Sequence, residues 1–355
     1  MHLAETQIES GAAVQRSDEI SPSQGWSAVL CVAEPERGAF FPASTLQRLE
    51  ARCDVRIVDR QVLDSAHGFA QSFDGVQIAI TSWGFPSLSA ERLVLAPQLR
   101  LVTHTGSSVK FLVTDEFWTS GVRISQAGAA MAASVAELSL AFTLALLRRI
   151  PEQDHALHDG SEWQVARTAR RGVEIAGARV GVVGASRTGR SYVERCQALG
   201  ADVLVHDPYL RHDDPLSDRS ATLESLLASC DVVAIHAPLT EESKGMLGRG
   251  QLASIRDGGV VVNTARSPLV DMDALYDEAA SGRLDVALDV FDVEPLPPDD
   301  RWRALPNVLL TPHLGGASVQ SRLRAGQIVV SEIERFISGR ALEHEVHRPA
   351  LERIG

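Results

Sequence analysis

Short apolar runs alternate with amphipathic stretches along most of the chain. Before residue 126, this pattern predicts strands at residues 27–33, 55–58, 76–81, 99–103 and 122–125, and helices at residues 42–53 and 89–96. Strands that alternate with helices form parallel sheets that are covered on both faces. We therefore expect the first part of the chain to form an α/β domain of its own.

A segment of small residues at 126–133 suits a hinge between two domains. Ser134 then favours the start of a long apolar helix, because Glu137 stands three residues later, as in a capping box. We expect this helix to run to about Arg149. The hinge and the helix together mark the beginning of a second domain.

Residues 178–207 carry the most informative pattern of the second part. An apolar run at 180–183 is followed by a glycine-rich turn, a helical stretch and a second apolar run at 203–205. A strand, turn, helix and strand of about 30 residues is the size of a βαβ unit with parallel strands. This unit is the expected core of the second domain.

The turn from Gly184 to Gly189 has the Gly-x-Gly-x-x-Gly spacing, with Ser186 in the middle position. Gly184 permits a sharp exit from the strand, Gly189 lets the helix approach the sheet, and the helix N-terminus suits a pyrophosphate. Asp207, about 20 residues on, can accept hydrogen bonds from ribose hydroxyls, which favours NAD over NADP. The alternative is an ordinary strand-to-helix turn. Ser186 would cost about 1 kcal/mol if its φ were positive.

Apolar runs continue after the βαβ unit and predict strands at residues 232–236, 259–263, 286–288 and 308–310. Helices are expected near residue 223, near residue 250, from residue 271 and from residue 318 to about residue 336. In such sheets the functional loops follow the carboxyl ends of the strands. The residues directly after each strand are therefore the candidates for a functional site.

The amino-acid composition limits the class of protein and the partners that it can bind. The chain has 355 residues, more than one hydrophobic core usually serves, and is 45% hydrophobic and 23% charged, as in ordinary globular proteins. A formal charge of -12 argues against nucleic acid or an anionic membrane surface as a partner. Residues 1–25 are expected to be disordered and not to be a targeting signal. Neither a metal site nor a disulfide framework is expected, and a reducing cytoplasm fits the four widely spaced cysteines, Cys31, Cys53, Cys196 and Cys230.

Several motifs resemble, in order and spacing, those of the D-isomer-specific 2-hydroxyacid dehydrogenases. They are SVAE at 134–137, HDPY at 206–209, HAPLTEESKGML at 236–247, NTARSPLVD at 263–271, ALDVFDVEPLP at 287–297 and TPHLGGAS at 311–318. The resemblance covers about residues 99–336, whereas the first 98 residues fit only by their alternation. It implies an NAD-dependent enzyme that interconverts a small D-2-hydroxy acid and its 2-oxo acid.

The chemistry of three residues agrees with this resemblance. Reduction of a 2-oxo acid needs a cation for the carboxylate and an acid for the developing alkoxide. Arg266 offers a planar fork for a carboxylate. By resemblance Arg266 orients the substrate, His313 is the general acid and base, and Glu294 holds the other nitrogen of the His313 ring. Taken alone, an arginine is more often in a surface salt bridge and a histidine is more often structural.

The resemblance also implies which residues bind the cofactor and the substrate. Asp289 would bind the nicotinamide carboxamide, and Ser107 and Ser108 would offer backbone N–H groups to the substrate carboxylate. In this loop Lys110 stands where the family carries an acidic residue. The full predicted cofactor set is Gly184, Ser186, Arg187, Thr188, Gly189, Asp207, His236, Ala237, Pro238, Thr264, Ala265 and Asp289.

The expected fold is α/β with two Rossmann-like domains. A doubly wound NAD-binding domain, residues 130–318, is inserted in a discontinuous flavodoxin-like substrate domain, residues 1–129 and 319–355, and the family implies a homodimer. The polar stretch 155–171, with Trp163, is an arm that meets another subunit or a loop folded on its own chain. A non-enzymatic NAD(H)-sensing regulator and a phosphite-type dehydrogenase stay open, whereas formate dehydrogenases carry glutamine at the position of Glu294.

Overall fold

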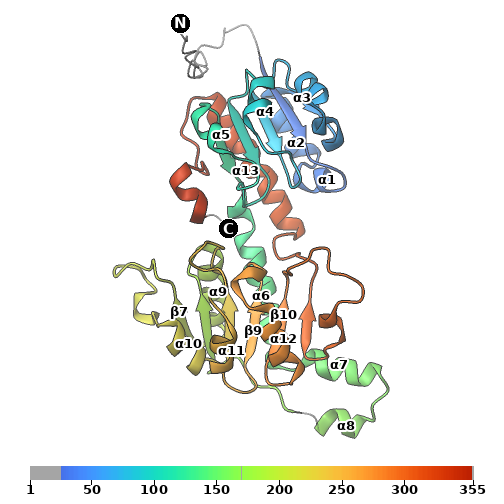
Figure 1. The fold of residues 1–355 in the computed structure, drawn as a ribbon, viewed down its shortest axis with the longest axis vertical. Coiled ribbons are helices and arrows are strands. Elements are labelled where there is room, and N and C mark those ends of the chain that lie inside the picture. Colours follow the sequence, from blue (N-terminus) through green and yellow to red (C-terminus); the bar gives the residue numbers. More distant parts are fainter. Residues whose placement is uncertain (1–24, 169, 354–355) are drawn as a thin grey trace, which may run out of the picture. The chain divides into compact units, whose positions relative to one another are not determined.

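The computed structural model describes residues 25–168 and 170–353. The disorder predicted for residues 1–25 therefore falls outside the described residues, apart from Gly25. The chain divides into two compact units (Figure 1). The first unit is Met1–Ala127 with Ala325–Leu351, and the second is Gly128–Arg324 with Glu352–Gly355.

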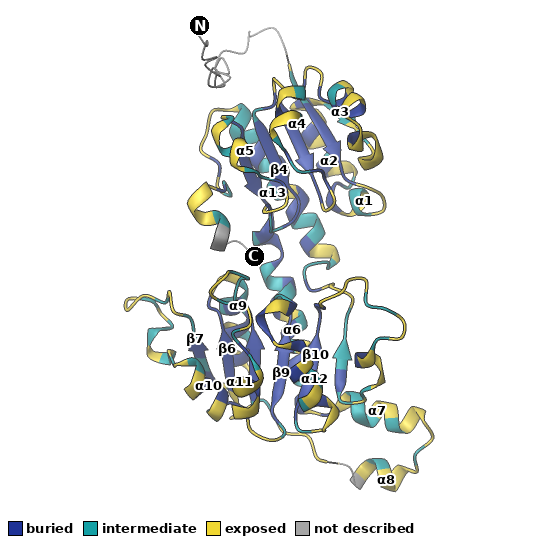
Figure 2. Ribbon diagram, viewed as in Figure 1, coloured by how far each residue is buried: buried dark blue, intermediate teal, exposed yellow. Residues whose placement is uncertain are grey.

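The first unit contains a sheet of five parallel strands in the order β2-β1-β3-β4-β5. This is the order of flavodoxin-like folds, in which the chain changes direction across the sheet between β1 and β3. Every residue of β3 and β4 is buried, and Figure 2 colours the ribbon by this burial. The strands are β1 (Trp26–Cys31), β2 (Cys53–Ile57), β3 (Ile78–Thr81), β4 (Leu101–His104) and β5 (Arg123–Gln126).

Short helices connect these strands, and more of them form than the sequence predicted. The two predicted helices correspond to α2 (Ala43–Glu50) and α4 (Ala90–Leu95), and the others are α1 (Glu36–Phe40), α3 (Ala66–Ser72) and α5 (Asp115–Thr119), with 3-10 turns η1 (Arg60–Asp64) and η6 (Arg348–Arg353). The unpredicted helices span five to seven residues. An apolar period is hard to recognise in so few residues.

The second unit contains six parallel strands in the order β11-β10-β9-β8-β6-β7. The chain reverses its direction across this sheet between β6 and β8, which is where doubly wound sheets bind ligands. Two parallel sheets with alternating helices confirm the predicted α/β class. The strands are β6 (Arg179–Val183), β7 (Asp202–His206), β8 (Val232–Ile235), β9 (Val260–Asn263), β10 (Asp285–Leu288) and β11 (Val308–Leu310).

Helices cover this sheet and bury its strands between them. Asp271 caps α12 by accepting a hydrogen bond from the N–H of Ala274 at 3.0 Å, as its place before the predicted helix suggests. The helices are α6 (Ala132–Leu147), α9 (Arg187–Ala198), α10 (Leu223–Ser229), α11 (Arg249–Ser254) and α12 (Met272–Ala280), with 3-10 turns η2 (Gly128–Ala130), η3 (Ser217–Arg219), η4 (Ser267–Leu269) and η5 (Arg301–Ala304). Helix α13 (Val319–Ile337) begins in this unit and belongs to the first unit from Ala325 on.

The predicted cap at Ser134 is wrong. Helix α6 begins at Ala132, directly after the 3-10 turn η2, so that Ser134 lies inside the first turn of the helix and is buried. The helix packs against β9, β10 and α9. The stretch Gly128–Leu147 is long and apolar enough to cross a membrane by length and composition, but a core helix passes the same test. The packing of α6 on the sheet identifies it as a core helix.

The predicted arm contains two helices, α7 (Ile150–His158) and α8 (Trp163–Thr168). Arg149 joins α6 to α7 with a left-handed φ of 56°. Its guanidinium forms a buried ion pair with Asp285 at 2.6 Å and a second ion pair with Glu152 at 2.9 Å. A strained residue persists where its surroundings fix it. This ion-pair cluster therefore fixes the point at which the arm leaves the second unit.

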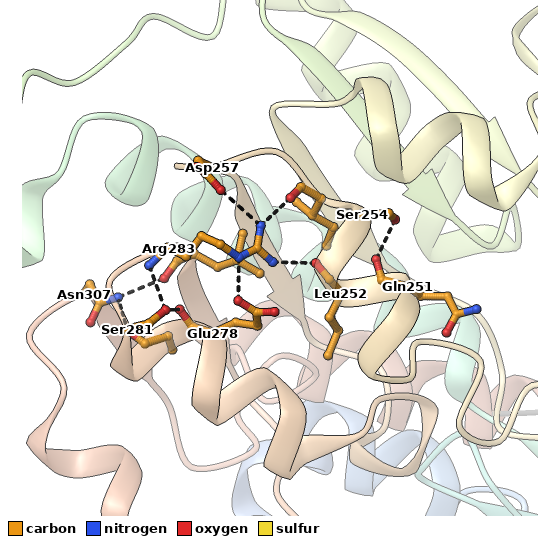
Figure 3. A network of polar contacts seen from close by, with 11 residues as sticks. Gln251, Leu252, Ser254, Asp257, Glu278, Ser281, Arg283 and Asn307 are labelled. Atoms are coloured by element: carbon orange, nitrogen blue, oxygen red, sulfur yellow. Dashed lines mark hydrogen bonds and ion pairs between the residues drawn. The ribbon is translucent and has the colours of Figure 1, made fainter.

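A separate polar network ties α11, α12 and β10 together before β10 begins (Figure 3). The Arg283 guanidinium donates hydrogen bonds to Glu278, to the carbonyl of Leu252 at 2.7 Å and to the carbonyl of Ile255. Asn307 Nδ2 donates to the carbonyls of Ala279 and Leu284. The network lies beside the amino end of β10, whereas the candidate functional residues follow the carboxyl ends of the strands.

Candidate active site

The predicted catalytic and cofactor residues of the second unit all follow the carboxyl ends of its strands. The turn at Gly184 follows β6, Asp207 follows β7 and His236 follows β8. Arg266 comes after β9, Asp289 to Glu294 after β10, and His313 after β11. Because the strands are parallel, these loops meet at one edge of one sheet. The second unit therefore gathers them at the place where such sheets bind ligands.

The glycine-rich turn has the shape that a diphosphate requires. Gly184 has a φ of +98°, and a Cβ on it would lie 2.5 Å from the backbone nitrogen of Ala237. A Cβ on Gly189 would lie 2.0 Å from the carbonyl oxygen of Gly184. Ser186, the N-cap of α9, has a φ of -73°, so its side chain causes no backbone strain. The first N–H groups of α9 have no carbonyl partner within the helix and suit an anion.

Asp207, the predicted ribose ligand, also shapes this turn. Its Oδ2 accepts the N–H of Ala185 at 2.7 Å and its Oδ1 accepts the N–H of Tyr209 at 2.9 Å. The Tyr209 hydroxyl donates to Glu242 at 2.6 Å, which connects the loops after β7 and β8. Each carboxylate oxygen has a second lone pair for a ribose hydroxyl. The residues present therefore fit a dinucleotide with an unphosphorylated ribose.

His236, which follows β8, is buried and uncharged. It is 6% exposed, and its ring lies 5.0 Å from the ring of Tyr192 on α9. Burial lowers the pKa of His236 to about 4, so the ring is neutral at neutral pH. Beyond β9, the hydroxyl of Thr264 lies 2.7 Å from the hydroxyl of Ser139 on α6. The N–H of Ala265 already donates to Asn263 Oδ1 at 3.0 Å.

His313 and Glu294 form the central pair of the site. His313 Nδ1 lies 2.8 Å from Glu294 Oε2, and Glu294 Oε1 accepts the N–H of Phe291 at 3.0 Å. A carboxylate accepts only, so this contact places the proton of the neutral ring on Nδ1 and leaves Nε2 for exchange with a substrate. The side chain of His313 is 47% exposed and that of Glu294 is 37% exposed, so a small molecule can reach them.

Asp289 holds the turn that carries His313. It is 1% exposed. Its Oδ1 accepts hydrogen bonds from the Thr311 hydroxyl and from the N–H of Leu314 at 2.7 Å, and its Oδ2 accepts the N–H of Gly315 at 2.8 Å. His313 lies between these anchors with a left-handed φ of 54°, which is costly for a residue with a Cβ. The carboxylate therefore fixes a strained backbone at the imidazole that the sequence predicts to be catalytic.

Arg266 lies mostly buried near the same pair. Burial lowers the pKa of its guanidinium, and the charge of Glu294 offsets part of that effect, so the two groups are near enough to interact. Its Nη1 donates to the carbonyl of Ala265 at 2.6 Å. The structure thus brings together all three predicted catalytic residues, Arg266, Glu294 and His313, at one edge of the second unit.

Ser107 and Ser108 belong to the first unit, where they follow the carboxyl end of β4 and are half-buried. A Cβ on the preceding Gly106 would lie 2.7 Å from Nε2 of His104 and 3.1 Å from Trp83, so this loop lies directly on aromatic side chains. His104 is fully buried, and burial lowers its pKa to about 4. These serines therefore lie at the carboxyl edge of their own sheet, where sheets of this kind bind ligands.

Sequence reasoning did not find several contacts that shape the site. It did not predict the bonds from Asp289 to the 311–315 turn, because their donors are mainly backbone N–H groups without a sequence signature. It also missed Asn263, whose side chain joins the backbone of Ala265 and Arg266, and the hydrogen bond between Ser267 and Asp292. The sequence signal that could have found these side chains is that they are polar and stand next to predicted catalytic residues.

Comparison with known proteins places this site in a family. Residues 140–315 match the family described as "D-isomer specific 2-hydroxyacid dehydrogenase, NAD binding domain". A D-3-phosphoglycerate dehydrogenase from Archaeoglobus fulgidus is 32% identical over 268 residues, which are 75% of this chain and 50% of that protein. The chain spans about half the length of the phosphoglycerate dehydrogenases that it matches.

Two further proteins match over most of their own length. A glyoxylate reductase from Korarchaeum cryptofilum is 33% identical over 257 residues, which are 71% of this chain and 77% of that protein. The crystal structure of the TT0316 protein from Thermus thermophilus has a TM-score of 0.77 and 30% identity, and covers 90% of this chain and 100% of that one. The chain therefore belongs to the D-isomer-specific 2-hydroxyacid dehydrogenase family.

Proposed function

We propose that this protein is an NAD-dependent dehydrogenase that interconverts a small D-2-hydroxy acid and its 2-oxo acid. The observation that carries the proposal is the 2.8 Å contact between His313 and Glu294, at the same sheet edge as the Gly184 turn. An imidazole oriented in this way is suited to exchange a proton with a substrate.

The second unit would bind the cofactor. The N–H groups at Arg187, Thr188 and Gly189 would bind the diphosphate, Asp207 would bind the adenine ribose, and His236 to Pro238 would line the cofactor site. The side chain of Thr264 and the carboxylate of Asp289 would lie on the nicotinamide side. When NADH is bound, it supplies the hydride that reduces the substrate carbonyl.

The catalytic residues would bind the substrate and move its proton. The Arg266 guanidinium binds the substrate carboxylate through two parallel hydrogen bonds. In reduction, His313 Nε2 donates a proton to the carbonyl oxygen, and in oxidation it accepts the proton of the hydroxyl. Glu294 holds the ring in the required tautomer and stabilises the imidazolium that exists before the proton leaves. Partial burial strengthens these charge interactions.

In the first unit, the backbone N–H groups at Ser107 and Ser108 would donate to a substrate carboxylate. Next to this loop, the rings of Trp83 and Phe111 are 51% and 40% exposed, and both contact the uncharged ring of His104. We therefore propose that the first unit is the substrate domain, residues 1–129 and 319–355, and that the NAD-binding domain is residues 130–318.

The direct experiment is NADH oxidation by the full chain with glyoxylate, hydroxypyruvate, pyruvate and phenylpyruvate. We expect turnover of at least one of them to the D-2-hydroxy acid, and a loss of about 10²- to 10⁴-fold in kcat for His313→Ala. Unchanged activity in this variant would refute the assigned mechanism. NADH binding without turnover across a broad panel would favour the alternative, an NAD(H)-sensing regulator.

We further propose a cytoplasmic homodimer that associates through the arm formed by α7 and α8. Trp163 and Val165 on α8 are 68% and 62% exposed, and Ile150 on α7 is 55% exposed. Large exposed apolar side chains gathered on one segment are typical of protein interfaces. Light scattering should give a dimer for the wild type and a monomer for Trp163→Glu with Val165→Glu. Val94→Glu, at a residue on α4 that is 72% exposed, is the control.

A further inference from the structure

The backbone around Arg266 is held in shape by Asn263. The Asn263 side chain accepts the N–H of Ala265 and donates to the carbonyl of Arg266, both at 3.0 Å. Asn263 is fully buried at the end of β9. Both bonds lie within the loop after β9. They fix the shape of this loop, but they do not tie it to the loop that carries Glu294.

A side-chain contact adds such a connection to the backbone hydrogen bond that the N–H of Asp289 donates to the carbonyl of Asn263. The Ser267 hydroxyl donates a hydrogen bond to Asp292 Oδ1. Ser267 directly follows Arg266 and is 3% exposed, whereas Asp292 lies two residues before Glu294 in the loop after β10. The contact therefore links the loop of the guanidinium to the loop of the carboxylate that holds His313.

The segment from Asp289 to Glu294, which carries Asp292, is held in place by contacts of its other residues. Each of its three carboxylates makes a different contact: Asp289 holds the turn of His313, Asp292 holds Ser267, and Glu294 holds the imidazole itself. Phe291 lies between them, is 9% exposed and packs in the hydrophobic core of the second unit. Asp292 is thus anchored through Phe291 on one side and Glu294 on the other.

We propose that Ser267 and Asp292 are positioning residues that set the separation between Arg266 and His313. A 2-oxo acid carries its carboxylate and its carbonyl oxygen on neighbouring carbons, so a guanidinium and an imidazole can serve both only at one separation. Loss of the link lets the Arg266 loop move relative to the imidazole, and the carboxylate is bound less tightly. This inference rests on the function proposed above.

The position of the hydrogen bond between Ser267 and Asp292 distinguishes a positioning role from a purely structural one. Asp292 is exposed, so its carboxylate is hydrated when the serine hydroxyl is removed, and the core around Phe291 is unchanged. Ser267→Ala therefore leaves no buried polar group without a partner, whereas Asp292→Ala leaves the buried Ser267 hydroxyl without this acceptor and lowers the stability. In Ser267→Ala, substrate binding should respond far more than thermal stability does.

The experiment is a double-mutant cycle with Ser267→Ala, Asp292→Ala and the combined variant. Each should raise the KM for the best 2-oxo acid by about 10-fold, the loss expected for one hydrogen bond to a charged group. The combined variant should show the same increase as each single variant, because all three remove one contact. The kcat value and the NADH Kd should stay within about twofold of the wild type, and Ser267→Thr, which retains a hydroxyl, should restore the KM.

Ser281→Ala and Asp299→Asn are the matched controls, because both side chains lie exposed in the same unit. An unchanged KM, multiplied losses in the combined variant, or a fall in kcat without a rise in KM would overturn the inference. The Kd of oxamate in the presence of NADH gives a second readout that needs no turnover. If oxamate binding depends on Ser267 but the chain reduces no 2-oxo acid, the proposed function is refuted and the link is supported. If substitution of Ser267 and Asp292 leaves oxamate binding unchanged, the link is refuted.

Discussion

Asp289 offers a sharp test of how the site is held. Asp289→Asn preserves the size of the side chain but replaces one acceptor oxygen with an N–H donor. Three donors, the Thr311 hydroxyl and the N–H groups of Leu314 and Gly315, then share one oxygen. At least one buried donor loses its partner, at a cost of about 1–3 kcal/mol, and the remaining bonds lose the benefit of the charge. We expect a total loss of about 2–4 kcal/mol.

This loss should be visible without any cofactor. For a unit of this size it corresponds to a fall in Tm of about 4–16 °C. The kcat should fall by at least about 10-fold, because His313 is then free to leave its left-handed conformation. Differential scanning calorimetry of the cofactor-free protein measures the first effect, and Asp299→Asn is the control. An unchanged Tm together with weaker NADH binding would show that Asp289 acts on the nicotinamide alone, and would refute this reasoning.

Three other predictions follow from the structure. Gly189→Ala should weaken NADH binding by at least about 10-fold, because its Cβ would lie 2.0 Å from a backbone oxygen of the turn, and fluorescence titration with NADH would measure this. Arg283→Met should lower the free energy of unfolding by about 2–3 kcal/mol and leave kcat/KM unchanged, because its network lies away from the site; urea unfolding with parallel kinetics tests both. Burial lowers the folded-state pKa of His104 and His236 to about 4, below the unfolded value near 6.5, so stability is complete above pH 6.5 and is lost as the pH falls toward 4. At pH 5 each of these histidines should lower the free energy of unfolding by about 2 kcal/mol relative to pH 7. Urea midpoints that do not change over this range would contradict the prediction.

The strands and the cofactor turn could be predicted because their signals are local. Each predicted strand overlaps a strand of the structure, and Gly184, at the predicted sharp exit from β6, has a positive φ. The spacing could not reveal that Ser186 is unstrained, because φ is not written in the sequence. The start of α6 was misplaced for a similar reason. A 3-10 turn of small residues leads into the helix before Ser134, so the capping signal was not used.

The three proposed catalytic residues, Arg266, Glu294 and His313, could be predicted only as separate motifs. Their proximity depends on the strand order, which brings β9, β10 and β11 side by side. The contacts that support the trio depend on residues far apart in sequence, such as Asp289 and Gly315. Donors of this kind are backbone N–H groups, which every residue other than proline carries. A sequence therefore indicates the reactive side chains more clearly than it indicates the groups that hold them in place.

The central claim is that an imidazole held by Glu294 transfers the proton in a reaction with a 2-oxo acid. The most direct measurement is single-turnover NADH oxidation by the wild type, His313→Ala and Glu294→Gln with the best 2-oxo acid, with NADH affinity measured in parallel. We expect NADH affinity within about twofold in all three proteins, and a rate reduced by about 10²-fold or more in both variants. A rate that does not change in His313→Ala while NADH remains bound would show that His313 does not transfer the proton.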